Sequence, residues 1–294
     1  MDKNIKNIPK IILEENIDLN REMDLFFSFL HHPYYVQNRN FIFQVFPELE
    51  KLLEKQGEKK QIIKLFISKF YGDNKNEIQK IIQKNKNILM KKSELSLIAL
   101  FGIMDYQYEK PVVYKAAPTI LPFSPFGDDI FYFSILGEIN GKADKNILTI
   151  GIHEISHFIF SDILKKIENK RDVILPDDVK NYLKEALAVV ILNQEPLCGI
   201  LELKNYKGNP EIQNLRIEKP DGSIKTFTDF LNECYDAIKM KKQKSFCVFL
   251  EKIISILLPI APEFAKKRVL WNKYGKKVLK EPKIIKLYSK PIKI

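Results

Sequence analysis

The chain has 294 residues, of which 45% are hydrophobic and 29% are charged, and its formal net charge is +11. This composition is ordinary for a globular protein, argues against wholesale disorder and allows a buried core. The positive charge is concentrated near the C-terminal end, where the segment from Phe264 to Ile294 holds eleven basic residues and one acidic residue.

The cellular setting is inferred from segments that the sequence lacks. The first twenty residues contain no apolar core of the kind found in a secretory signal. The most apolar stretch, 247–262, is interrupted by two charged residues and is shorter than the about 20 residues that a membrane-spanning helix needs. The three cysteines Cys198, Cys234 and Cys247 cannot all pair and form no C-x-x-C motif. We therefore expect a cytoplasmic protein without a membrane span.

The N-terminal region, 1–110, is predicted to be helical. From residue 10 to about 105, apolar residues recur three and four positions apart, over Ile11–Leu30, Ile62–Phe70 and Ile78–Ile82. His31-His32-Pro33 should end the first helix, because the residue before a proline is biased away from helical angles. Ser93 is a plausible N-cap for a further helix.

The region 111–263 mixes strand and helix signals. Prolines at 111, 118, 122 and 125 predict irregular extended segments, whereas Ile130–Ile135 is β-branched and aromatic enough for a strand. After a turn at residues 140–141, one helix is expected over 146–166 and another from an N-cap at Asp177 to about 193. Two further helices are expected over 228–242 and 246–258. The chain should therefore adopt a mostly helical α+β fold.

One motif carries most of the chemical information. His153-Glu154-Ile155-Ser156-His157 matches the H-E-x-x-H pattern and uses half of the four histidines. On a helix, residues four apart lie on the same face, so both imidazoles can reach one metal ion while the intervening Glu lies beside a metal-activated water. Between 146 and 161, Glu154 is the sole charged residue. Burying His and Glu there demands partners, and a zinc ion, one per chain, satisfies that demand. The alternative is a buried helix whose His and Glu side chains only form hydrogen bonds.

The third metal ligand must come from another segment, and Glu185 is the best candidate. It lies on the next predicted helix, beside the small residues Ala186 and Ala188, which let that helix approach the first closely. A wholly apolar run follows it, so this Glu is not expected to be a solvated surface residue. The competing donors are Asp162, Asp177, Asp178 and Cys198.

These two motifs resemble the gluzincin metallopeptidases, which carry H-E-x-x-H on one helix and a Glu ligand on a following helix. The resemblance covers about 130–195 and implies zinc, peptide-bond hydrolysis and a strand along the cleft, here Ile130–Ile135, within a zincin-like catalytic unit over 111–263. The chain lacks the G-x-M-E-N of aminopeptidases, the N-E-x-x-S-D of thermolysin-like enzymes and the third His of metzincins. The anti-repressor peptidases of mobile elements share a similar H-E-I-x-H.

The predicted function is thus a zinc-dependent hydrolase that cleaves peptide bonds, with His153, His157 and Glu185 as ligands and Glu154 as the general base. A tetrahedral intermediate also needs a second electrophile. Tyr182, one turn before Glu185, is the first candidate for this role, and Tyr206 and Tyr235 are the others.

The basic C-terminal tail, 264–294, has two interpretations. It could contact nucleic acid or another acidic partner, and this gives the alternative function of a metal-containing binding protein. It could also be a solvated, lysine-rich end that packs on the body of the protein through Trp271, Tyr274 and Tyr288.

Overall fold

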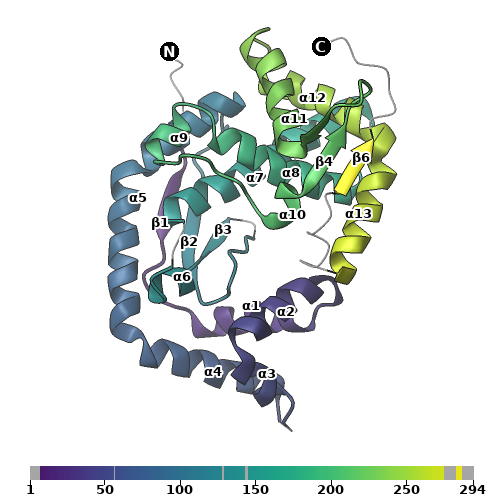
Figure 1. Cartoon of the computed structure of the whole chain (residues 1–294). Coiled ribbons are helices and arrows are strands. Elements are labelled where there is room, and N and C mark those ends of the chain that lie inside the picture. The colour runs from purple at the N-terminus through teal and green to yellow at the C-terminus, as the bar shows by residue number, and fades with distance from the viewer. Residues whose placement is uncertain (1–6, 56, 128, 143–144, 275–282, 287–294) are drawn as a thin grey trace. The chain divides into compact units, whose positions relative to one another are not determined.

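The computed structural model of the chain describes residues 7–55, 57–127, 129–142, 145–274 and 283–286 (Figure 1). These residues are mostly helical, and two small three-stranded sheets accompany the helices, which confirms the predicted mostly helical α+β class. The chain forms two compact units. The first contains 95–109 and 152–294, and the second contains 7–94 and 110–151.

Neither unit is continuous in the sequence. Helices α5 (Lys75–Met104) and α7 (Ile147–Arg171) each contribute residues to both units, so each unit is assembled from separate stretches of chain. The four residues of the predicted metal site all belong to the first unit.

The second unit is built on a parallel sheet. Its strands β1 (Lys10–Leu13), β2 (Val113–Thr119) and β3 (Ile130–Ser134) lie in the order β1-β2-β3. The prediction of β3 is confirmed, but the expected helix over residues 10–13 is wrong. These residues pair with β2, about a hundred residues later in the chain, with Lys10 opposite Val113. A local hydrophobic period cannot reveal such a distant partner.

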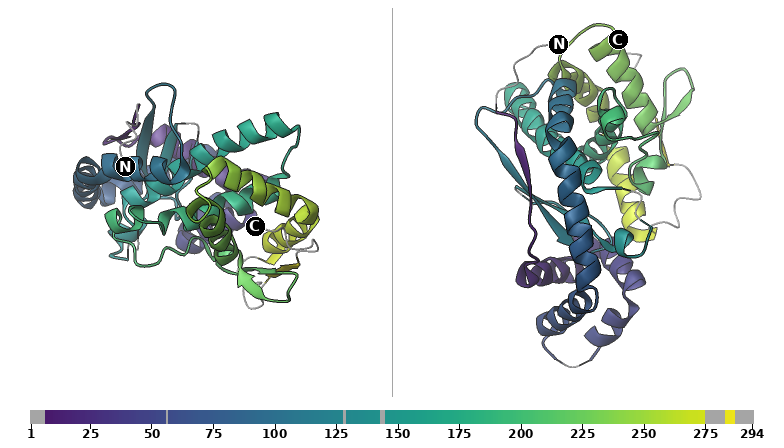
Figure 2. Two further views of the ribbon diagram at one scale, coloured as in Figure 1. Left: turned by 90° about the horizontal axis from the view of Figure 1, so that it is seen from above. Right: turned by 90° about the vertical axis from the view of Figure 1, so that its left-hand side faces the viewer.

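Helices make up most of the rest of this unit. Helix α1 begins after Asp18, whose carboxylate accepts hydrogen bonds from the N–H groups of Asn20 and Arg21, and it ends at His31, before Pro33, as predicted. Ser93 does not cap a new helix, because α5 runs unbroken through that position (Figure 2). The other helices of this unit are α2 (Val36–Val45), α3 (Pro47–Leu53), α4 (Lys59–Asp73), α6 (Leu136–Ile139) and the 3-10 turn η1 (Pro33–Tyr35).

Glu22 of α1 is buried in this unit and accepts three hydrogen bonds. The donors to its Oε1 are the hydroxyl of Thr119 at 2.9 Å, the N–H of Ile120 at 2.9 Å and the hydroxyl of Tyr71 at 3.3 Å. Burial raises the pKa of Glu22 to about 7, although the three hydrogen bonds favour the ionised form.

The first unit contains helices packed around α8 (Asp177–Leu192), together with the second sheet. Helices α11 (Phe227–Tyr235) and α13 (Ala261–Tyr274) both contact α8. The expected helix over 246–258 is α12 (Phe246–Leu257). The remaining elements are the short helices α9 (Leu197–Ile200) and α10 (Pro210–Gln213), the π-helix η2 (Asp236–Met240) and the 3-10 turn η3 (Leu258–Ile260).

The second sheet was not predicted. Its central strand β4 (Leu215–Glu218) pairs antiparallel with β5 (Ile224–Thr226) and parallel with β6 (Lys283–Lys286). A turn at residues 219–223 joins β4 to β5, and each strand is too short to produce a clear alternation in the sequence.

The expected basic tail contributes regular structure to the first unit. Its first eleven residues continue α13, where Phe264 is fully buried, and Ile285 of β6 is also fully buried. Residues 275–282 and 287–294, including Tyr288, lie outside the described residues. The basic residues near this end therefore belong in part to a packed element.

Among the described residues, α7 is the one helix whose length and hydropathy would allow it to cross a membrane. In the most apolar 18-residue stretch of α7, 78% is buried inside the protein. A core helix has the same length, composition and burial, so α7 is weak evidence for a membrane span.

Candidate metal centre

Helix α7 places His153 and His157 one turn apart on the same face. Their ring centroids are 4.4 Å apart with an interplanar angle of 72°. His157 is 1% exposed and His153 is 9% exposed. Gly151, two residues before the motif, allows this helix to begin close to β3, because a Cβ at Gly151 would lie 2.7 Å from the Phe131 ring. The spacing of the histidines follows from the helix alone, whereas their burial depends on tertiary packing.

Glu185 of α8 faces both imidazoles. Its Oε1 lies 3.2 Å from Nε2 of His157, and its Oε2 lies 3.6 Å from Nε2 of His153. The Glu185 side chain is 26% exposed, so the group that completes this cluster retains access to solvent. Ala186 and Ala188 beside it are buried.

Glu154 lies against this cluster from the same helix as the histidines. Its carboxylate is 6% exposed, and its Oε1 is 4.0 Å from Nε2 of His153. The donor atoms of His153, Glu154 and His157 all lie within 4.8 Å of one another, a spacing at which they could hold a metal ion. The structure thus brings together the four residues that the sequence singled out.

The environment gives these groups the protonation states that a metal ligand needs. Burial, together with the neighbouring His153, lowers the pKa of His157 to about 4, so its imidazole is neutral at neutral pH. Burial by itself would raise the pKa of Glu185, but the two imidazoles outweigh that effect and hold the pKa well below its usual value. Neutral imidazoles and an ionised carboxylate are the forms that bind divalent metals.

Two residues of the loop between α9 and α10 contact the cluster. The hydroxyl of Tyr206 lies 3.1 Å from Nδ1 of His153, and the Nδ2 amide of Asn209 donates to Oε2 of Glu185 at 3.2 Å. The sequence analysis considered Tyr206 as an electrophile and did not identify Asn209. Nothing in a single sequence distinguishes a supporting amide from any other loop asparagine.

Tyr182, the first candidate for the electrophile, has a different partner. Its hydroxyl donates to Glu211, which is buried and also pairs with Arg268 at 2.8 Å. Tyr235 is buried against Phe249, with ring centroids 5.5 Å apart. Tyr206 is therefore the one of the three predicted tyrosines with a recorded contact to a histidine of the motif.

The competing donors have contacts of their own. Asp162 accepts a hydrogen bond from Tyr106 at 2.5 Å and pairs with Lys166 at 3.0 Å. Burial raises the pKa of the Cys198 thiol, and the neighbouring Glu195 adds to this effect. Asp177 and Asp178 occupy the first turn of α8. Pro176 is the N-cap residue in place of the expected Asp177.

The His31-His32 pair belongs to the second unit. Both side chains are exposed, His31 stacks on Phe27 with ring centroids 4.1 Å apart, and its Nδ1 lies 2.9 Å from the carbonyl oxygen of that residue. These contacts fit a structural role at the end of a helix.

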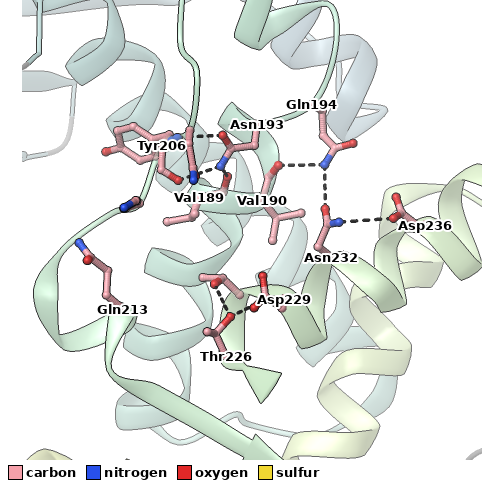
Figure 3. A pocket seen from close by; sticks show the side chains of 13 residues that line it. Val189, Val190, Asn193, Gln194, Tyr206, Gln213, Thr226, Asp229, Asn232 and Asp236 are labelled. Atoms are coloured by element: carbon pink, nitrogen blue, oxygen red, sulfur yellow. Dashed lines mark hydrogen bonds between the residues drawn. The ribbon is translucent and has the colours of Figure 1, made fainter. Parts of the chain in front are cut away.

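A polar hollow of about 590 Å³ lies in the first unit, the unit that holds the four site residues (Figure 3). Among the described residues, none of the four site residues lines it, but Tyr206 does. Several of its side chains bond one another: Gln194 donates to Asn232 at 3.0 Å, and Asn232 donates to Asp236 at 3.3 Å. Tyr206 therefore both lines the hollow and contacts His153.

Comparisons with protein-family models, with curated proteins and with solved structures find no match to this chain. The resemblance to gluzincins thus depends on the motif residues and their geometry.

Proposed function

We propose that this protein is a zinc-dependent hydrolase of the gluzincin type that cleaves peptide bonds. The observation that carries the proposal is the convergence of His153, His157 and Glu185 from two helices, with the carboxylate of Glu154 beside them.

The spacing of the donor atoms supports zinc as the bound ion. In four-coordinate zinc sites, ligand atoms at about 2.0–2.2 Å from the metal lie roughly 3.3–3.6 Å from one another. Oε1 of Glu185 lies 3.2 Å from Nε2 of His157, close to this range. Two histidines and one carboxylate form the usual protein ligand set of a catalytic zinc site, which leaves one position open.

A zinc ion held by these residues would lower the pKa of a water molecule towards about 7 and polarise a substrate carbonyl. Glu154 takes a proton from the attacking water and then delivers it to the leaving amine of the cleaved peptide bond. Its burial at 6% exposure keeps this carboxylate beside the ligands and shielded from bulk water. A structural metal site would have no use for such a carboxylate.

The test combines metal analysis with a cleavage assay on a mixture of synthetic peptides analysed by mass spectrometry. Wild-type protein should bind one zinc ion per chain and cleave peptides, and removal of zinc by a chelator should stop cleavage. Glu154→Gln should retain zinc and lose activity, because Glu154 is the base and is not a ligand. A matched control on the same helix is Glu168→Gln, which keeps the acceptor for the N–H of Leu175 and should remain active. If Glu154→Gln keeps even a tenth of the wild-type activity, this mechanism is wrong.

A further inference from the structure

A single loop, residues 201–209 between α9 and α10, reaches two of the three proposed metal ligands. Tyr206 contacts Nδ1 of His153, and Asn209 contacts Oε2 of Glu185. Both contacts are made to an atom that a metal ion held by the Nε2 atoms and by Oε1 of Glu185 would not bind. In His153 this atom is Nδ1, and in Glu185 it is Oε2, which lies farther from an imidazole nitrogen than Oε1 does.

Each contact fits the form of the ligand that binds metal. An imidazole that offers its Nε2 lone pair to a metal carries its proton on Nδ1, and the Tyr206 oxygen can accept that proton in a hydrogen bond. Tyr206 is 6% exposed, so little water competes for this bond. The Nδ2 amide of Asn209 can only donate, and it therefore favours the ionised Glu185 carboxylate.

The loop itself is held against α8 by Asn193. The Asn193 carboxamide accepts from the N–H of Tyr206 at 2.9 Å and donates to its carbonyl oxygen at 2.8 Å, so it fixes the main chain on both sides (Figure 3). The same Nδ2 group also donates to the carbonyl oxygen of Val189 in α8 at 2.8 Å. Because Glu185 and Asn193 both lie at α8, one helix supplies a ligand and anchors the loop that supports two ligands.

The C-terminal end of the loop is fixed as well. Gly208 adopts a left-handed conformation with φ +68°, and a Cβ there would lie 2.5 Å from Cγ2 of Val189, so the loop runs tightly along α8. The Oδ1 atom of Asn209 accepts from the N–H of Ile212 at 3.0 Å and caps α10, which leaves its amide directed at Glu185.

We propose that the loop 201–209 is a positioning element for the metal site: Tyr206 sets the tautomer and ring orientation of His153, and Asn209 sets the orientation of the Glu185 carboxylate. This inference rests on the proposed function. Removal of such a supporting contact typically weakens metal affinity about 10- to 100-fold.

The experiment measures zinc affinity by competition with a chromophoric chelator, using full-length protein. Tyr206→Phe removes the hydroxyl and keeps the ring. Asn209→Ser removes the amide donor and keeps an oxygen that can cap α10. The matched control is Tyr235→Phe, which removes the hydroxyl of another buried tyrosine of the same unit. Both loop variants should bind zinc about 10- to 100-fold more weakly than wild type, and the control should be unchanged.

A second measurement needs no metal. In zinc-free protein, the ring nitrogen spectra of the four histidines should report how the proton of His153 is shared between Nδ1 and Nε2, and Tyr206→Phe should shift it towards the Nε2 tautomer. Wild-type affinity in both loop variants, or a loss in only one of them, overturns the shared role of the loop, as does an unchanged tautomer in Tyr206→Phe. A wild-type protein that binds no zinc would count instead against the proposed function, and the tautomer of His153 would then decide the role of Tyr206.

Discussion

Phe264 of α13 packs against Tyr182 of α8, with their ring centroids 5.6 Å apart. Phe264 is fully buried and also contacts Phe227 of α11 at 5.6 Å between centroids. The first residue of the predicted basic tail is therefore part of the core of the unit that holds the candidate metal centre. Arg268, one turn further along α13, pairs with the buried Glu211 and strengthens this attachment.

We expect Phe264→Ala to destabilise the protein by about 3–5 kcal/mol, because it removes a buried aromatic ring and leaves a cavity. Val269→Ala provides the control, since Val269 lies on the same helix and is 65% exposed. Chemical denaturation of the two variants measures the difference. Equal stabilities would show that α13 does not depend on this contact and would restore the idea of a tail that only carries charge.

Glu185→Ala should lose most of its bound zinc, because two neutral imidazoles leave the +2 charge of the ion without a compensating carboxylate. Cys198→Ser should keep its zinc, and Asp178→Ala should have a smaller effect than Glu185→Ala. Zinc content of the purified proteins is the measurement. A Glu185→Ala protein with a full complement of zinc would remove Glu185 from the ligand set and the gluzincin proposal with it.

Gly208→Ala should destabilise the loop 201–209 by roughly 1–3 kcal/mol, because an alanine strains the left-handed backbone and collides with Val189. Adding Val189→Ala should recover the part that is due to the collision, which a double-mutant cycle measures by thermal or chemical denaturation. Gly102→Ala is the control: it lies in α5 with no atom within 4 Å of the added Cβ. If the two glycine variants are equally stable, Gly208 has no special conformational role.

Glu22 should make stability depend on pH between about 4.5 and 7. Its pKa is raised to about 7 in the folded protein, so the folded state binds the proton more tightly than the unfolded state does. Stability should therefore fall as the pH rises through this window, by roughly 2–4 kcal/mol. Glu22→Gln keeps the acceptor oxygen and cannot ionise. The free energy of unfolding of Glu22→Gln minus that of wild type should therefore increase from pH 5 to pH 8. A value of this difference that is independent of pH would contradict the raised pKa.

The chemistry of the candidate site was visible in the sequence because it depends on a local rule. Residues four apart on a helix share a face, so His153 and His157 define a candidate metal-binding pair before any tertiary contact is known. Small neighbours and an apolar run identified Glu185 for the same local reason. The helices that carry these residues were also predicted, over 146–166 and from residue 177 to about 193.

Only the tertiary structure decided which residues support the site and which segments close the fold. Tyr206 and Asn209 reach His153 and Glu185 because Asn193 and Gly208 hold their loop along α8, and no short-range pattern encodes that contact. The strand Lys10–Leu13 likewise depends on a partner far away in the chain, and so does β6 of the basic tail, which pairs with β4. Local periodicity specifies the conformation of a segment and the face it presents, whereas its partner is chosen by the packing of the whole unit.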